Sequence, residues 1–194
     1  MEETFQRIYE NYHNDIFQFL FYMVKDKSQA EDLVQEVYIR VLKSYKNFEG
    51  RSSEKTWLLS IARHVAIDWF RKQQTLRQRM LGTFDWDKQE IKDSQQLPDE
   101  LVEQNENLQE IYNALDECTI DQRSVIILRF IHGFSISETA EALTFSESKV
   151  KTTQHRGLKS LRKHLELLKE EQGFEEERVE RRTDKGITKS TSNS

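Results

Sequence analysis

The stretch "SISETAEALTFSESKVKTTQHRGLKSLRKHL", residues 135–165, decides the fold of the C-terminal half. Its opening letters match a capping box, in which Ser135 and Glu138 satisfy backbone N–H groups at a helix start. A short helix, "ISETAEAL", is followed by a tight turn, "TFS", and Ser146 is placed to cap a longer helix that runs to about Leu168. A short helix, a turn of a few residues and a longer helix form a helix-turn-helix. We therefore predict this motif over about residues 136–156.

The second helix of the motif is basic although the chain is acidic. The chain has 34 Asp and Glu against 29 Lys and Arg, a formal net charge of −5. No acid lies between Glu147 and Glu166, whereas the basic residues there are Lys149, Lys151, Arg156, Lys159, Arg162 and Lys163. Cations suit the end of a helix, so a solvated basic face is one interpretation. They also occupy the first two turns, where the helix dipole disfavours them, and this favours DNA binding.

The positions along the basic helix predict two roles. Its inward stripe is expected to be Val150, Leu158, Leu161 and Leu165, with Gly157 allowing close packing of the first helix. A recognition helix enters the major groove, where side chains of its first turns reach base edges. The candidate DNA-binding residues are Ser148, Lys149, Lys151, Thr152, Gln154, His155, Arg156 and Lys159. Lys159 and Arg162, further along the helix, are better placed for phosphates than for base edges.

The N-terminal half has the apolar spacing of three helices. The first follows apolar residues three and four apart from Phe5 to Leu20. The second is expected to open with a capping box at "SQAE", from Ser28 to Glu31. The third follows the loop "NFEGRSSE", with a turn at Gly50 and a cap at Ser52 or Ser53, and its apolar stripe runs from Trp57 to Phe70.

Cations and aromatic residues alternate around this third helix. Between residues 55 and 79, Asp68 alone opposes Lys55, Arg63, Arg71, Lys72, Arg77 and Arg79. The aromatic residues are Phe48, Trp57, Trp69 and Phe70. Stacking surfaces beside cations suit unpaired bases. The alternative is a core role for Trp57 and Trp69, which lie on the apolar stripe, and a plain surface role for His64.

The composition predicts an all-α protein of two small helical domains. One proline and six glycines in 194 residues favour long helices. The first domain covers residues 1–80, and the second covers 107–168 and contains the helix-turn-helix. An extended linker, residues 81–106, joins them, because eight acids and Pro98 fall there with little periodicity. The charged tail, residues 169–194, is expected to be disordered.

Several classes of function are disfavoured. The single Cys118 excludes an internal disulfide and the common zinc patterns, and it indicates a reducing, cytoplasmic location. The acidic N-terminus is not a signal peptide, and the longest apolar stretch, "DIFQFLFYMV", is too short to span a bilayer. No nucleophile motif, phosphate loop or His-x-x-x-His spacing occurs. We therefore expect no enzyme activity, metal, cofactor or small-molecule substrate.

Three segments together resemble the extracytoplasmic-function class of bacterial sigma factors (group IV of the sigma-70 family), close to its sigma-X subtype. They are "AEDLVQEVYIRVLKSY", "FEGRSSEKTWLLSIARHVAIDWFRK" and "LDECTIDQRSVIILRFIHGFSISETAEALTFSESKVKTTQHRGLKSLRKHL". The resemblance covers about residues 5–168. The chain departs from the family pattern at Thr144, where glycine is common, and at the start of the recognition helix. These departures bear on promoter sequence and not on the class.

The resemblance implies a division of labour between two domains. The first, region two, would bind core RNA polymerase through about residues 30–43, at Asp32, Leu33, Gln35, Glu36, Ile39 and Arg40. About residues 47–75 would recognise and melt the −10 element, at Asn47, Phe48, Gly50, Arg51, Lys55, Arg63, His64 and Asp68. The second domain, region four, would read the −35 element. The implied partners are core RNA polymerase, promoter DNA and a membrane-associated anti-sigma factor, for an envelope-stress-type regulon.

Two other functions remain open from the residues. A stand-alone helix-turn-helix regulator would need a dimer interface or an effector site, and it would leave the N-terminal motifs unexplained. Tight binding of the free protein to a promoter duplex without polymerase would favour that alternative. A pure interaction module would not need base-facing polar residues behind three capped helices.

Overall fold

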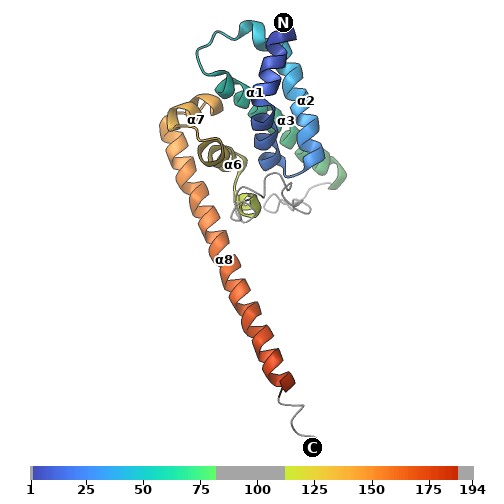
Figure 1. The fold of residues 1–194 in the computed structure, drawn as a ribbon, viewed down its shortest axis with the longest axis vertical. Helices are drawn as coiled ribbons and strands as arrows, with labels where there is room; N and C mark the ends of the chain where they lie inside the picture. Colours follow the sequence, from blue (N-terminus) through green and yellow to red (C-terminus); the bar gives the residue numbers. More distant parts are fainter. Residues whose placement is uncertain (1, 82–111, 188–194) are drawn as a thin grey trace, which may run out of the picture.

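The computed structural model describes residues 2–81 and 112–187, and these residues form helices without any strand. The N-terminal domain holds α1 (Glu2–Val24), α2 (Lys27–Ser44), the short 3-10 helix η1 (Tyr45–Asn47) and α3 (Glu54–Leu81). The C-terminal domain holds η2 (Leu115–Glu117), α6 (Ile120–Ile126), the π-helical η3 (Ile127–Ile131), α7 (Ile136–Leu143) and α8 (Glu147–Ile187) (Figure 1). The all-α prediction is confirmed. The predicted linker lies outside the described residues, except for Leu81.

The N-terminal domain is a bundle in which α1, α2 and α3 pack on one another. The helix α2 begins at Lys27, where the Asp26 carboxylate accepts the N–H of Gln29 at 2.8 Å. The predicted capping box at Ser28 is therefore wrong. An ionised acceptor two residues earlier meets the positive helix end. The cap of α3 is Ser53, whose hydroxyl accepts the N–H of Thr56 at 3.0 Å, as one of the two predicted alternatives requires.

The C-terminal domain contains the predicted helix-turn-helix. Capping boxes at Thr119 and Ser135 open α6 and α7, and the predicted one at Ser135 is thereby confirmed. The turn places Thr144 in the left-handed region, with φ 54° and ψ 40°. The Ser146 hydroxyl then accepts the N–H of Lys149 at 3.2 Å, which caps α8 as predicted.

Two predictions about α8 are wrong. The sequence predicts an end near Leu168, whereas α8 continues to Ile187 and projects away from the other helices (Figure 1). Residues 188–194 of the tail predicted to be disordered lie outside the described residues. Residues 169–187 are rich in Glu, Lys and Arg and have no proline, so their helix propensity is favourable. Leu158 is not inward-facing, because 39% of it is exposed and Gly157 takes the buried position against α6.

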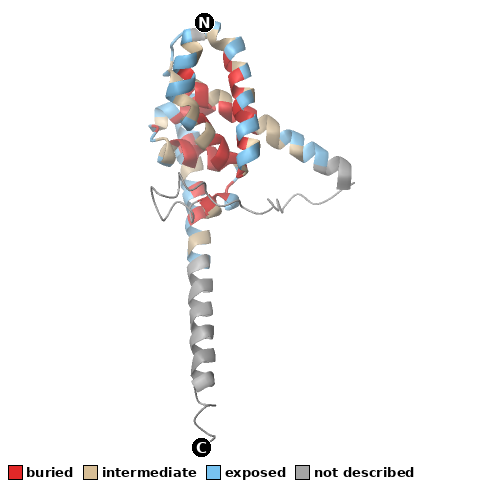
Figure 2. Ribbon diagram, turned by 45° about the vertical axis from the view of Figure 1, so that its right-hand side comes forward, coloured by how far each residue is buried: buried red, intermediate tan, exposed pale blue. Residues whose placement is uncertain are grey.

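The two domains pack together into one body. The helix α7 lies against α3, and α1 contacts α6 and η3. Buried residues of both domains form a single apolar cluster, seen as the buried segments in the upper part of Figure 2. This arrangement places the start of α8 beside the N-terminal domain.

We expect Gly157→Ala to lower the free energy of unfolding by about 1 kcal/mol, because overpacking outweighs the gain in helix propensity. A Cβ at Gly157 would lie 2.7 Å from Ile126 Cδ1 and 3.3 Å from Gln122 Cβ. Ile126→Val removes Cδ1, so it should rescue the alanine variant. Chemical denaturation followed by circular dichroism measures the two single variants and the double variant. Strictly additive effects would contradict the close approach.

We expect Thr144→Gly to be more stable than Thr144→Ala by about 1 kcal/mol, because only glycine adopts the left-handed region without a steric cost. Both changes remove the hydroxyl that donates to the Leu143 carbonyl, so the comparison isolates the backbone. Thermal and chemical unfolding of the two variants measures the difference. Equal stability would mean that the turn relaxes to another conformation.

Candidate nucleic-acid interface

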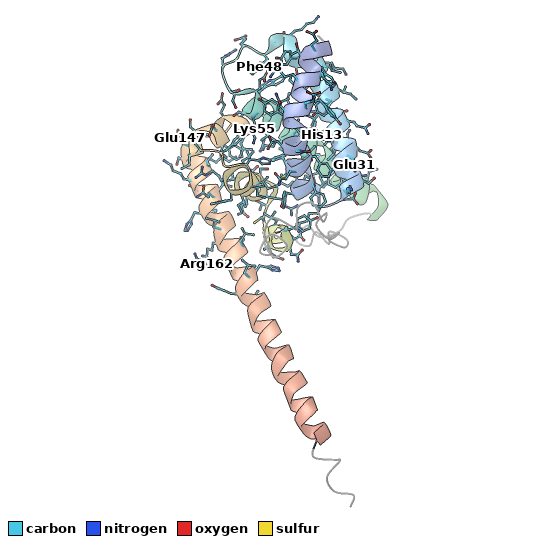
Figure 3. The ribbon with its side chains drawn as sticks, viewed as in Figure 1. His13, Glu31, Phe48, Lys55, Glu147 and Arg162 are labelled. Atoms are coloured by element: carbon cyan, nitrogen blue, oxygen red, sulfur yellow. The ribbon has the colours of Figure 1, made fainter. Side chains whose placement is uncertain are left out.

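The start of α8 presents a polar surface to solvent. Of the eight residues predicted to contact DNA there, all but the half-buried Gln154 are exposed. Figure 3 shows Glu147 at the first turn and Arg162 several turns further along, so the zones predicted for bases and for phosphates follow one helix. The outward orientation is confirmed, and DNA contact stays a prediction.

Two of the predicted base-reading side chains are held by other residues. Lys149 Nζ lies 3.3 Å from the Asp121 carboxylate and 3.4 Å from the centroid of the Phe145 ring. Gln154 Oε1 accepts a hydrogen bond from Arg129 Nε at 3.0 Å. Arg129 also donates to the Phe134 carbonyl, which fixes its guanidinium. The amide of Gln154 is thereby oriented before any ligand arrives.

The loop predicted to capture a −10 base has an aromatic side. Phe48 packs between Tyr45 and Trp57, with ring centroids 6.0 Å and 4.9 Å away. Asn47 ends η1, and Gly50 has φ 69°, as the predicted turn requires. Arg51 is exposed and pairs with Glu49 at 2.7 Å. The half-buried rings of Phe48 and Trp57 are therefore ordered next to an exposed loop.

Trp69 serves the packing of the N-terminal domain. Its Nε1 donates a hydrogen bond to Gln29 Oε1 at 2.8 Å, and its ring meets Phe70 edge-on. The core interpretation from the sequence is the right one for this residue.

Two of the predicted −10 residues on α3 form ion pairs. Lys55 pairs with Asp15 at 2.8 Å, and Asp68 pairs with Arg40 at 3.0 Å. Burial alone would raise the pKa of Asp15, but hydrogen bonds from His132 and Lys55 outweigh it and hold that pKa below its ordinary value. Lys55 and Asp68 are therefore both paired within the N-terminal domain.

His64 and Arg63 lie in different surroundings on α3. His64 is exposed, and its Nδ1 lies 2.7 Å from the Ser60 carbonyl. Since a carbonyl can only accept, Nδ1 carries a proton and Nε2 faces outward without that constraint. Arg63 is 7% exposed and pairs with Asp121 at 3.0 Å. The expectation that Arg63 is open to DNA strands is wrong for this arrangement, because Asp121 of α6 and the Phe145 ring lie against its guanidinium.

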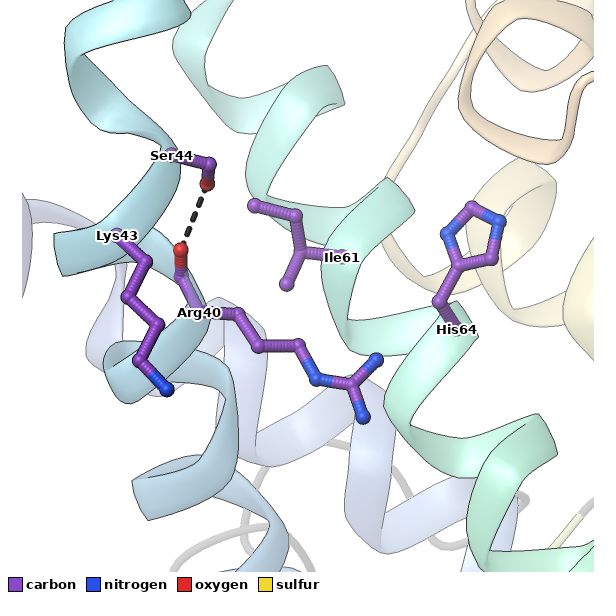
Figure 4. A pocket seen from close by; sticks show the side chains of 5 residues that line it. All are labelled: Arg40, Lys43, Ser44, Ile61 and His64. Carbon is purple, nitrogen blue, oxygen red and sulfur yellow. Dashed lines mark hydrogen bonds between the residues drawn. The ribbon is translucent and has the colours of Figure 1, made fainter.

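A shallow pocket of about 320 Å³ lies between α2 and α3 (Figure 4). It is lined by Arg40, Lys43, Ser44, Ile61 and His64. The Arg40 guanidinium is held by Glu36 at 2.9 Å as well as by Asp68. Sequence reasoning misses Lys43 and Ile61. Helical spacing could have indicated both residues, because side chains three residues apart lie on the same face of a helix. Lys43 follows Arg40 by three residues, and Ile61 precedes His64 by three.

The face of α2 predicted to meet polymerase is mostly open. Asp32 and Gln35 are exposed, and Ile39 is 46% exposed. Leu33 is buried at 8%, so its assignment to the binding surface is wrong. Leu33 follows Asp32 directly on α2, and its side chain is buried in the core of the bundle.

A second polar cluster joins the domains. Lys25, 2% exposed, lies 2.7 Å from Asp116, and its burial lowers its pKa to about 8. Arg123 donates to the carbonyls of Met23 at 2.6 Å and Leu115 at 3.1 Å. Sequence reasoning misses this cluster, and no local spacing signals it, since its members lie far apart in the chain.

The described part of the chain carries neither a metal centre nor a membrane span. No group of three His, Cys, Asp or Glu side chains in residues 2–81 and 112–187 could hold a metal ion. None of the helices there combines the length and apolar character that a bilayer crossing needs. Burial raises the pKa of the Cys118 thiol to about 11, so this thiol is unreactive near neutral pH.

Comparison with known proteins identifies both domains. Residues 8–75 match Sigma-70 region 2, and residues 108–161 match Sigma-70, region 4. The chain is 76% identical over 194 residues to the ECF RNA polymerase sigma factor SigX of Bacillus subtilis (strain 168), covering 100% of both chains. It is 31% identical to the ECF RNA polymerase sigma factor SigW of the same organism, over 84% of this chain and 90% of that one.

Solved structures share the fold. The sigma factor RpoE, in complex with the anti-sigma factor NepR from Bartonella quintana, matches with a TM-score of 0.67 at 24% identity, over 84% of this chain and 98% of that one. CnrH, in complex with the cytosolic domain of CnrY, matches with a TM-score of 0.62 at 18% identity, over 86% and 90%. With two family domains in order and a full-length relative, the chain belongs to the extracytoplasmic-function RNA polymerase sigma factors of the sigma-70 family.

Proposed function

We propose that this protein is an initiation factor that binds core RNA polymerase, directs it to promoters through the −10 and −35 elements, and helps to melt the −10 region. The observation that carries the proposal is the helix-turn-helix whose capped second helix exposes a cationic, polar first half. Family membership supports the division between the two domains. It also supports action in the cytoplasm, an envelope-stress-type regulon and control by a membrane-associated anti-sigma factor.

Polymerase binding is assigned to the exposed face of α2. Asp32 and Gln35 offer polar groups, and Ile39 offers an apolar anchor between them and the C-terminal end of the helix. An exposed apolar side chain rimmed by polar groups is typical of a protein contact. Glu36 and Arg40 are held in a mutual ion pair, so they shape this surface more than they bind as free charges.

Strand opening is assigned to the loop of residues 47–53 and the adjacent part of α3. Extruding a base costs a few kcal/mol, which stacking and polar contacts can offset. Phe48 and Trp57 supply an ordered aromatic surface. The pocket beside them adds Lys43 and His64, which suit phosphates and base edges.

Duplex reading is assigned to the first turns of α8. Long side chains there reach base edges, and each good pair is worth roughly 1–3 kcal/mol of discrimination. The acidic remainder of the chain fits this role. Polymerase supplies much of the affinity for DNA, and a discriminating factor gains little from binding everywhere.

We expect Lys149→Ala to change which −35 sequences are preferred, and Lys159→Ala to weaken all promoters by a similar factor. Both variants lose one positive charge, but only Lys149 lies in the first turn of α8. Thr152→Ala and Gln154→Ala should also change the ranking. The measurement is transcription by polymerase holoenzyme from a library randomised across the −35 element. If no variant changes the ranking, α8 holds DNA without reading it.

We expect Asp32→Lys to reduce co-purification with core polymerase at least tenfold, because it reverses a charge on the proposed contact surface. Glu10→Lys on α1 makes the same charge change away from that face and should bind normally. Circular dichroism checks that both variants keep their helix content. Undiminished binding of a folded Asp32→Lys variant would reject the assignment of α2.

A further inference from the structure

One carboxylate holds a cation from each domain. Asp121 Oδ1 lies 3.0 Å from Arg63 Nη2 on α3, and Asp121 Oδ2 lies 3.3 Å from Lys149 Nζ on α8. Both cations also lie over the Phe145 ring, with Lys149 Nζ 3.4 Å and Arg63 Cζ 5.1 Å from its centroid. Two like charges therefore meet at one acid and one aromatic face.

We propose that Asp121 substitutes for a DNA phosphate and clasps the two domains in a closed state that withholds Arg63 and Lys149 from the promoter. The inference rests on the proposed function, which assigns the adjacent part of α3, where Arg63 lies, to the −10 region and Lys149 to the −35 element. A carboxylate and a phosphate bind the same guanidinium and ammonium groups. The clasp and the promoter therefore compete for the same two cations.

The clasp sits on a broad contact between the domains. Tyr112 stacks on Phe21, with ring centroids 5.3 Å apart, and meets Tyr22 edge-on. Arg123 reaches across to the Met23 carbonyl, and Asp116 forms ion pairs with both Arg123 and Lys25. These contacts stabilise the closed state. Releasing Asp121 therefore shifts the equilibrium between the closed and open arrangements, and each domain stays folded.

The same contact buries polar atoms that it does not satisfy. In the described part of the chain, buried atoms without a hydrogen-bond partner include Tyr22 Oη, Tyr112 Oη, Arg63 Nε and His132 Nε2. All four belong to residues that lie where the domains meet. A buried unsatisfied donor or acceptor opposes burial, and water satisfies it once the surface opens. The closed state is therefore poised to open.

The closed state buries Arg63, holds Lys149 in an ion pair and leaves the polymerase side free. Asp32, Gln35 and Ile39 are exposed in the same arrangement that buries Arg63. A chain in this state can meet polymerase while its cations are withheld from DNA, which limits binding to promoters by the free factor.

Asp121→Asn tests the clasp, because it leaves Arg63 and Lys149 together without a carboxylate. Breaking a buried pair is strongly unfavourable, and because Asp121 is partly exposed we expect about a tenfold shift towards the open state. Glu117→Gln is the matched control, since it removes one negative charge at an exposed position of the same domain. Asp116→Asn is a second variant, which leaves Lys25 and Arg123 without their shared acid.

The first measurement is the distance between the domains in the full-length protein without DNA or polymerase. Fluorophores are attached to Ser28→Cys on α2 and Glu141→Cys on α7, both exposed positions. The buried Cys118 stays unlabelled near neutral pH, because its pKa is about 11. Energy transfer should fall for Asp121→Asn and Asp116→Asn but not for Glu117→Gln. Unchanged transfer in both aspartate variants would overturn the closed state.

The second measurement is the affinity of the free protein for a promoter duplex. Asp121→Asn should bind about tenfold more tightly than both the parent and Glu117→Gln. If the domains separate and the affinity stays at the control value, Asp121 does not compete with phosphate and the proposal fails. Transcription by polymerase with the parent protein tests the proposed function separately, so the two failures are distinguishable.

Discussion

The buried guanidinium of Arg123 is the interaction on which the arrangement of the two domains depends. It is 3% exposed, and it donates to the Leu115 carbonyl in its own domain and to the Met23 carbonyl at the end of α1. A charge removed from water must be paired and hydrogen-bonded, so this side chain tolerates few alternative positions. Carbonyls in the last turn of a helix lack intrahelical partners, and Met23 offers such a group. Arg123 thereby fixes α6 against α1.

The position of α6 also determines where the Asp121 carboxylate lies in the contact between the domains. Asp121 lies two residues before Arg123 and in the first turn of the same helix. Once α6 is fixed against α1, the Asp121 carboxylate lies between α3 and the start of α8. The burial of Arg63 and the pairing of Lys149 are consequences of this geometry. Electrostatics at the surface proposed to bind DNA is therefore tied to packing in the aromatic region around Tyr112.

Within the C-terminal domain, the backbone conformation of one turn sets the direction of α8. The chain turns from α7 into α8 through Thr144, a β-branched residue held at a positive φ. The steric cost of that conformation is offset because the turn allows α8 to cross α6 at Gly157, where the Ile126 side chain packs directly on the glycine backbone. The exposed half of α8 follows from this crossing, since one face of the helix is committed to α6.

The sequence by itself determined the features that depend on neighbours within four residues. The capping box at Ser135, the cap at Ser146 and the helix-turn-helix spacing are local patterns, and all are confirmed. The tertiary structure alone decided which faces the other domain covers. Arg63 and Asp121 are 58 residues apart, and Met23 and Arg123 are 100 apart. Helical periodicity assigns Arg63 to a polar face, but it carries no information about a distant helix that packs on that face. Periodicity is a property of one helix, whereas burial at an interface is a property of two.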